Sequence, residues 1–168
     1  MTGKQFTAKE LEVVYQIVKE YKEKSPESED EYYNDYYDEY EEPINKKIIS
    51  SVLKKVAQQL PKEIREEIDK CFLRKRYHTY NNFVDDKVYR TLKKALSQLK
   101  TVEISYFNRE SAKLKKRNID VYYTSAKYTI GYCHLRKDMR KFRTNRIASA
   151  KLTDQTYNIP QDFNKNDY

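Results

Sequence analysis

The chain has 168 residues, of which 38% are apolar and 36% are charged, and its formal net charge is +8. This length suits one ordinary domain, or a helical segment joined to a small barrel, and argues against two large independent domains. No run of residues approaches the roughly 20 apolar positions of a membrane span, and residues 1–9 lack the apolar core of a signal peptide. We therefore expect a folded cytoplasmic protein that has no membrane partner.

The charge is distributed unevenly along the chain. Residues 25–43 (SPESEDEYYNDYYDEYEEP) hold nine of the 26 acidic residues and no Lys or Arg. The rest of the chain therefore contains 17 acidic residues and all 34 Lys and Arg residues. We interpret this segment as an extended loop between helices, because its charges repel one another. An alternative is that its nine carboxylates and five tyrosines imitate a nucleic acid and occupy a basic site of this chain or of a partner.

Apolar residues at helical spacing predict two helices before Pro61. Thr7 and Glu10 form a capping-box pattern at the start of a helix over about residues 7–23. A second apolar stripe covers residues 44–60, and Pro61 marks its end or starts the next helix at position N1.

Two further helices are predicted before residue 100. The run PKEIREEIDKCF reads as a short third helix. Asn81 or Asn82 can cap a fourth helix, whose apolar face runs from Val88 to Leu99. The first hundred residues are therefore expected to be mostly helical.

At Lys100 the apolar period changes from 3.6 to 2, which predicts β-strands. Several short strands within about 55 residues favour closure into a small barrel, because closure hides the edges of a short sheet. The five predicted strands are TVEISYFN, NIDVYY, YTIGYCHL, MRKFRTNRI and AKLTDQTYNI, with turns near residues 108–111 and 137–138. The predicted fold is α+β, with a helical segment of about four helices over 1–99, a five-stranded barrel over 100–158 and a C-terminal tail over 159–168.

Basic and aromatic residues gather in one predicted hairpin, from Tyr128 to Arg146. Guanidinium groups bind phosphate bidentately and aromatic rings stack on bases, so this combination suits a single-stranded nucleic acid or a nucleotide. The alternative is that the charges are only solvated and that Phe142 belongs to the core. Strict alternation places Arg140 and Arg143 on opposite faces, so both contact one ligand only if the strand bulges or ends between them.

The run KYTIGYCHLRKDMRKFRTNRIASAKLT resembles the second half of the WYL domain, where a motif like W-Y-L-x-A-Y-C precedes R-x-F-R-x-x-R-I. Lys127, Tyr128 and Thr129 stand at W-Y-L, and residues 140–147 keep all three arginines and the phenylalanine. The segments TVEISYFN, RNIDVYY, FTAKELEVVY and VLKKVAQQLPKEIREEI also resemble parts of these regulators. The resemblance thus covers about residues 6–157.

This resemblance implies an Sm-like or SH3-like barrel that senses a ligand, often a nucleic acid, and that regulates an attached helix-turn-helix in a bacterial transcription regulator. Relatives also suggest a homodimer. The ligand-contact candidates are Lys127, Tyr128, His134, Arg140, Phe142, Arg143 and Arg146. For Arg146 a structural ion pair is an alternative.

The helix-turn-helix of the family would precede residue 6, where this sequence has only MTGKQ. The second hypothesis is therefore a free-standing WYL protein of a phage-defence or CRISPR system, which acts through RNA binding or through a protein partner. A missing recognition helix argues against sequence-specific duplex binding by this chain.

We expect no catalysis, no metal and no cofactor. His78 and His134 are the two histidines of the chain, and no His/Cys cluster has the spacing of a zinc site. Cys133 and His134 are neighbours on a predicted strand, so they point to opposite faces and cannot act as a thiolate–imidazole pair. Cys71 and Cys133 are expected to be buried, reduced thiols.

Overall fold

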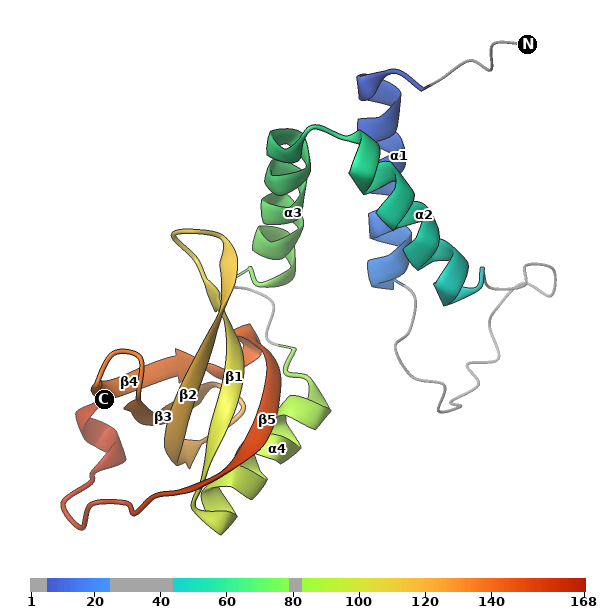
Figure 1. Ribbon diagram of the computed structural model, residues 1–168. Coiled ribbons are helices and arrows are strands. Elements are labelled where there is room, and N and C mark those ends of the chain that lie inside the picture. The colour runs from blue at the N-terminus through green and yellow to red at the C-terminus, as the bar shows by residue number, and fades with distance from the viewer. Residues whose placement is uncertain (1–5, 25–43, 79–82) are drawn as a thin grey trace. The chain divides into compact units, whose positions relative to one another are not determined.

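The computed structural model describes residues 6–24, 44–78 and 83–168, and the chain divides into two compact units, residues 1–69 and 70–168. The acidic segment 25–43 lies outside the described residues, so its predicted roles stay predictions. Four helices precede five strands, which confirms the α+β class (Figure 1). The elements are α1 (Ala8–Lys24), α2 (Lys46–Gln59), α3 (Lys62–Arg76), α4 (Asp86–Gln98), β1 (Lys100–Asn108), β2 (Lys113–Thr124), β3 (Tyr128–Cys133), β4 (Asp138–Arg143) and β5 (Ile147–Thr156), with 3-10 turns at Thr144–Arg146 and Lys165–Asp167.

In the first unit, α1 and α2 pack side by side (Figure 1). The predicted capping box at the start of α1 is confirmed. The Glu10 carboxylate accepts hydrogen bonds from the main-chain N–H of Thr7 at 2.7 Å and from the Thr7 hydroxyl at 2.8 Å, and the Thr7 hydroxyl accepts from the Glu10 N–H at 3.3 Å. These bonds satisfy N–H groups that no helical carbonyl can reach.

A second contact within this unit joins α1 to Asp69 of α3. The Tyr15 hydroxyl donates to Asp69 Oδ1 at 3.0 Å, and Lys19 forms an ion pair with the same carboxylate. Burial, followed by the hydrogen bond to Asp69 and its negative charge, raises the pKa of Tyr15 to about 12.

In the second unit, α4 begins later than the sequence indicated. Its cap is Asp85, whose carboxylate accepts from the Val88 N–H at 2.9 Å, so the prediction of a cap at Asn81 or Asn82 is wrong. Both asparagines lie outside the described residues. Asp85 has extended backbone angles, which allow its side chain to reach back to the first turn.

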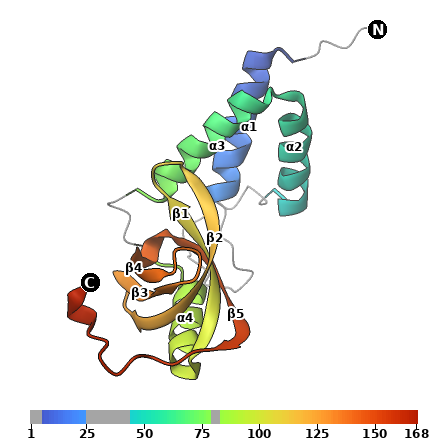
Figure 2. The ribbon, with the colours of Figure 1, turned by 60° about the vertical axis from the view of Figure 1, so that its left-hand side comes forward.

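The five strands form one antiparallel sheet in the order β4-β3-β2-β1-β5. The predicted closure into a barrel is wrong, because β4 and β5 are the two edges and the described strands contain no ladder between them. Helix α4 packs against β1, β2 and β5 (Figure 2). It covers the apolar face of the sheet, so this face is hidden from water without closure.

The core lies between α4 and the sheet. It comprises Val88, Leu92, Ala95, Val102, Ile104, Ile119, Val121, Cys133, Phe142 and Ile147. Cys133 is buried as predicted, whereas Cys71 on α3 is exposed, which corrects the prediction for that thiol.

Gly131 allows β2 and β3 to approach closely. A Cβ atom at this position would lie 2.1 Å from the main-chain oxygen of Asp120. A side chain here would therefore force these two central strands apart, and the glycine is required by packing rather than by a ligand.

The stability of the first unit should fall between about pH 10 and about pH 12. Because the folded state keeps the Tyr15 proton to a higher pH than the unfolded chain does, its contribution is complete below the ordinary pKa of 10 and is lost as the pH rises toward about 12. Urea unfolding of the helices, followed by circular dichroism, should show a steeper loss over this interval in the wild type than in Tyr15→Phe. Equal slopes in the two proteins would contradict this assignment.

Candidate functional site

Three cationic side chains surround the ring of Tyr128 at the start of β3. The Nζ atom of Lys141 lies 4.6 Å from the ring centroid, Nζ of Lys127 lies 5.5 Å from it, and Cζ of Arg143 lies 5.6 Å from it. We call these four residues the Tyr128 site. No Asp or Glu carboxylate in the described part of the chain forms an ion pair with any of the three cations. The ring attracts them through its quadrupole, and Lys141 also donates to the main-chain oxygen of Tyr168.

The pairing of β3 with β4 brings these residues together. Tyr128 pairs directly with Arg143, and Lys141 pairs with Ile130, two positions along the strand. Because strand side chains alternate, Tyr128, Lys141 and Arg143 share one face of the sheet. Sequence analysis named Lys127, Tyr128 and Arg143 but missed Lys141, although its spacing from Arg143 was the signal that could have found it.

Hydroxyl groups hold the backbone beneath the Tyr128 site. The Ser125 N–H donates to the Tyr128 carbonyl at 2.8 Å, and the Ser125 hydroxyl accepts from the Tyr128 N–H at 3.1 Å. The Thr144 N–H donates to the Lys127 carbonyl at 3.2 Å, and the Thr144 hydroxyl donates to the Ser125 carbonyl at 2.8 Å. The hydroxyls of Thr144 and Thr129, both fully buried, are 3.1 Å apart. The start of β3 is thus fixed on both sides by hydrogen bonds.

Phe142 faces away from the Tyr128 site. Its side chain is 4% exposed and lies in the core, where its ring meets that of Tyr106 edge-on with centroids 5.1 Å apart. It lies between Lys141 and Arg143 in the sequence, so alternation directs it to the opposite face. Its role in the structure is packing.

His134 belongs to a different cluster at the other end of β3. Its Nε2 lies 2.9 Å from Asp120 Oδ1, which also accepts from the Thr101 hydroxyl at 2.6 Å. The His134 ring contacts Tyr132 edge-on, with centroids 5.4 Å apart. Tyr128 begins β3, which has six residues, and His134 directly follows the strand, so the two are about 20 Å apart along the chain. The structure therefore does not bring His134 together with the Tyr128 site.

The other two predicted arginines also lie apart from the Tyr128 site. The β3–β4 ladder has no bulge, so Arg140 lies on the face opposite to Arg143, where it forms an exposed ion pair with Asp138 at 3.1 Å. Arg146 lies in the 3-10 turn before β5, and its buried Nε has no hydrogen-bond partner. The alternative of a structural ion pair is not found, because no carboxylate of the described residues pairs with Arg146.

The C-terminal segment, residues 157–168, lies beside the Tyr128 site. The ring of Tyr122 on β2 contacts Tyr157 at 5.7 Å and Phe163 at 5.2 Å between centroids, and Phe163 stacks on Tyr168 at 6.1 Å. Lys141 donates a hydrogen bond to the main-chain oxygen of Tyr168. One cation of the Tyr128 site is therefore shared with this segment.

Two tyrosines of this aromatic contact, Tyr122 and Tyr157, are partly buried. Desolvation, together with the nearby charge of Asp120, raises the pKa of both Tyr122 and Tyr157. Both therefore stay neutral phenols at ordinary pH, and the Tyr157 hydroxyl donates to the Val121 carbonyl.

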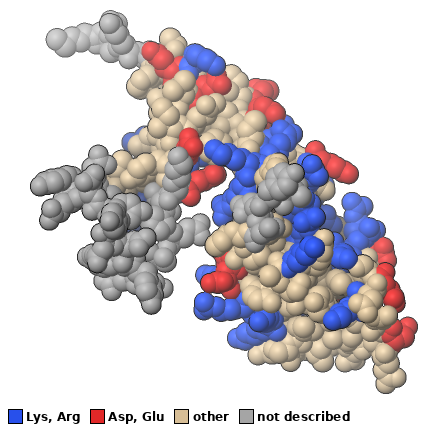
Figure 3. Space-filling view, turned by 180° about the vertical axis from the view of Figure 1, so that it is seen from behind, with Lys and Arg blue, Asp and Glu red and all other residues tan. Residues whose placement is uncertain are grey.

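Lys and Arg side chains are prominent on the face drawn in Figure 3. The described residues contain no group of three or more His, Cys, Asp or Glu side chains placed to hold a metal ion. None of the helices in the described ranges is both long enough and apolar enough to cross a bilayer.

The family model of the WYL domain matches residues 87–152, which span α4 and most of the sheet. This match confirms the predicted resemblance over those residues. The sequence matches no curated protein. Among solved structures the chain is similar to proteasome accessory factor B/C (PafBC) of Arthrobacter aurescens, with 15% identity and a TM-score of 0.39. The similarity covers 95% of this chain and 23% of that one, so the chain spans about a quarter of the length of PafBC.

The contacts of Asp120 with Thr101 and His134 should contribute mainly to the stability of the folded protein. Asp120→Ala leaves the buried Thr101 hydroxyl without its acceptor, so we expect a loss of about 1–3 kcal/mol in the free energy of unfolding. Asp138→Ala is the matched control, because it removes only an exposed ion pair that contributes about 0–1 kcal/mol. Urea unfolding of both variants measures the difference, and equal losses would refute this account of Asp120.

Proposed function

We propose, from the premise that residues 87–152 are a WYL domain, that this chain is a regulatory module that binds a single-stranded nucleic acid or nucleotide-like ligand through the Tyr128 site. The observation that carries the proposal is the gathering of Lys127, Lys141 and Arg143 around one aromatic ring, where no Asp or Glu of the described residues pairs with them. A ring with several cations offers both interactions that a nucleotide needs, which are stacking for the base and charge for the phosphate.

A hydrogen bond to phosphate is stronger than a contact with the Tyr128 ring, so these cations should bind phosphate in preference to the ring. A cation–π contact at an exposed site contributes about 0.5–1 kcal/mol. A hydrogen bond between ionised groups contributes about 1.5–3 kcal/mol. A phosphate oxygen therefore draws Lys141 and Arg143 away from the face of Tyr128, and the ring becomes available to a base.

The hydroxyl network supports this exchange. Ser125 and Thr144 fix the main chain on both sides of Tyr128, so the ring loses little conformational freedom when a base stacks on it. A receptor that is ordered before binding keeps more of its contact energy as affinity.

The shape of the sheet favours an extended ligand. The Tyr128 site lies at one end of β3 and His134 at the other, about 20 Å apart along the strand. A ligand that reaches both must run along β3, as a strand of several nucleotides does. We therefore expect an oligonucleotide to bind more tightly than a mononucleotide at this face.

Removing two cations should weaken binding to fluorescent single-stranded DNA and RNA. We expect Lys141→Ala/Arg143→Ala to bind at least about tenfold more weakly at low salt, because two charge-assisted contacts are lost. The slope of log affinity against log salt should fall by about 1.4, which is 0.7 for each phosphate contact to a single strand.

Lys151→Ala is the control for this measurement, since it removes one exposed cation from β5, at the opposite edge of the sheet. If the control loses as much affinity as the double variant, the binding reflects net charge and not the Tyr128 site. No binding by the wild type at low salt would reject the proposal and favour a protein-interaction module.

The C-terminal segment should compete with the ligand. A chain that ends at Gln161 lacks Phe163 and Tyr168, so Lys141 no longer donates to the Tyr168 oxygen. Because one net hydrogen bond contributes about 0.5–1.5 kcal/mol, we expect the oligonucleotide affinity to rise about threefold to tenfold. A matched chain with Phe163→Ala alone should show a smaller gain, and a fall in affinity on truncation would mean that the segment contributes to the site.

A further inference from the structure

The first half of β2 has a neighbouring strand on one side only. β2 has twelve residues and β3 has six, so the β2–β3 ladder begins at Ile119. Residues 113–117 pair with β1 on one side, and no strand of the described residues lies on their other side. Figure 1 shows this part of the β1–β2 hairpin extending past the end of β3. We call residues 113–117 the β2 edge.

Main-chain groups of the β2 edge point outward at alternate residues. The His134 N–H donates to the Asn118 carbonyl at 3.1 Å, so the main-chain groups of Asn118 face the side of β3. In an antiparallel strand, residues that face one neighbour alternate with residues that face the other. Because the register with β1 has no shift, Leu114 and Lys116 also face outward. No hydrogen bond among the described residues ends on their main-chain groups, so each offers one donor and one acceptor.

Three cationic side chains follow one face of the same strand. Alternation places Lys113, Lys115 and Arg117 on this face at intervals of about 6.8 Å. Lys113 and Lys115 are exposed, and no carboxylate in the described part of the chain forms an ion pair with any of the three. Lys116 points to the other face, where its Nζ lies 3.0 Å from Glu103 Oε1. The strand thus carries its paired lysine on one face and its unpaired cations on the other.

Arg117 is the buried member of this row. The residue is 9% exposed, and its Nε is buried without a hydrogen-bond partner. Its Nη1 lies 3.9 Å from Cys133 Sγ, and a thiol is only a weak acceptor. Removing a cation from water is costly unless an acid accompanies it. An acidic side chain brought beside the β2 edge would offset part of this cost.

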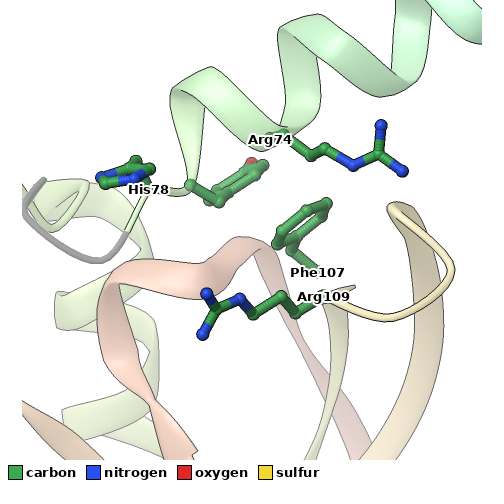
Figure 4. Close-up of a pocket in the computed structure, with 5 residues that line it drawn as sticks. Arg74, His78, Phe107 and Arg109 are labelled. Atoms are coloured by element: carbon green, nitrogen blue, oxygen red, sulfur yellow. The ribbon is translucent and has the colours of Figure 1, made fainter.

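Packing against the end of α3 anchors the hairpin that carries the β2 edge. Phe107, which pairs with Leu114, stacks on Tyr77 with ring centroids 5.0 Å apart. Both rings are buried, and Ala112 packs with them. The two rings also line a pocket of about 210 Å³ together with Arg74, His78 and Arg109 (Figure 4). An edge held in this way loses little conformational freedom when a partner binds.

The main-chain groups and the charges together favour an acidic β-strand as the partner. An extended peptide adds to a strand edge through main-chain hydrogen bonds, and its alternate side chains supply specificity. Carboxylates at alternate positions would lie opposite Lys113 and Lys115, and opposite charges stabilise such cross-strand pairs. A second copy of this edge would place lysine against lysine, which keeps like edges apart. A nucleic acid matches the charge but does not continue the ladder.

We propose that the β2 edge binds an extended acidic segment of a partner protein, which adds as a strand beside residues 113–117. Carboxylates at every second position of that segment face Lys113, Lys115 and Arg117. The position opposite Leu114, which is 42% exposed, takes an apolar residue. The β2 edge shares no residue with the Tyr128 site and does not depend on it.

The test measures binding of fluorescent peptides to the whole chain by anisotropy at low salt. The probe is Thr-Glu-Val-Glu-Val-Glu-Thr, and its control is Thr-Val-Glu-Glu-Glu-Val-Thr, which has the same composition and charge. We expect the probe to bind about threefold to tenfold more tightly, because only alternation places all three carboxylates on one face. Equal binding of the two peptides, or no binding of the probe, would overturn the proposal.

Methylation of main-chain nitrogens tests the hydrogen bonds separately from the charge. One peptide is N-methylated at both valines and another at the first two glutamates, so each loses N–H groups on one side of the strand. Only one of them should lose binding, because only one side of an added strand faces β2. An unchanged affinity in both peptides, or an equal loss in both, would show that the probe does not add as a strand.

Variants of the chain locate the site. Lys113→Ala/Lys115→Ala should weaken probe binding about threefold to tenfold, because two exposed ion pairs are lost. Leu114→Pro should also weaken it, since proline removes one outward N–H at a position where an edge strand tolerates it. Lys116→Ala is the matched control, because this exposed lysine of the same strand points to the other face and pairs with Glu103. An equal loss in the control and in the double variant would reduce the binding to net charge and reject the site.

Two further measurements separate the β2 edge from the Tyr128 site. Lys141→Ala/Arg143→Ala should bind the probe normally, and Lys113→Ala/Lys115→Ala should bind single-stranded oligonucleotides normally. If the second variant instead loses oligonucleotide affinity and keeps probe affinity, the edge binds nucleic acid and the proposal is wrong. Failure of the Tyr128 site would appear as oligonucleotide binding that is insensitive to Lys141→Ala/Arg143→Ala, with the peptide results unchanged.

Discussion

The packing of α4 against one face of the sheet determines which side chains remain for function. Leu92 and Ala95 are fully buried in this contact, and Phe142 joins the same core from β4. Because side chains alternate along a strand, burying Phe142 directs Lys141 and Arg143 to the other face. A hydrophobic contact thus places Lys141 and Arg143 on the face of the sheet that carries Tyr128.

Features that depend on near neighbours in the chain could be predicted from the sequence. The change of period at Lys100, the capping box of Thr7 and Glu10, and the five strands all follow local patterns that the structure confirms. Closure of the sheet could not be predicted in this way. Whether a small sheet closes depends on what else covers its apolar face, and here α4 covers it. The contact between α4 and the sheet depends on tertiary packing, which cannot be predicted from a local sequence pattern.

The candidate site was predicted only in part, for the same reason. In the sequence, the basic and aromatic residues lie close together along one hairpin. The pairing of β3 with β4 places some of them on opposite faces of the sheet and others far apart along the strand. Arg140 lies on the opposite face to Arg143, and His134 lies at the far end of β3 with Asp120. The pocket beside Tyr77 was missed altogether, because its two halves are about thirty residues apart and their spacing follows no rule.

The Tyr128 site and the pocket beside Tyr77 differ in their surroundings. At the exposed Tyr128 site, salt weakens attraction beyond the Debye length of about 10 Å, so charge alone cannot select one polyanion over another. We expect selection there to depend on the ring of Tyr128 and on competition from the C-terminal segment, whose Tyr168 oxygen accepts a hydrogen bond from Lys141. In the pocket beside Tyr77, the lining includes the stacked, buried rings of Tyr77 and Phe107. We propose that the net charge of +8 attracts anionic ligands to the protein and that the ring of Tyr128 selects among them.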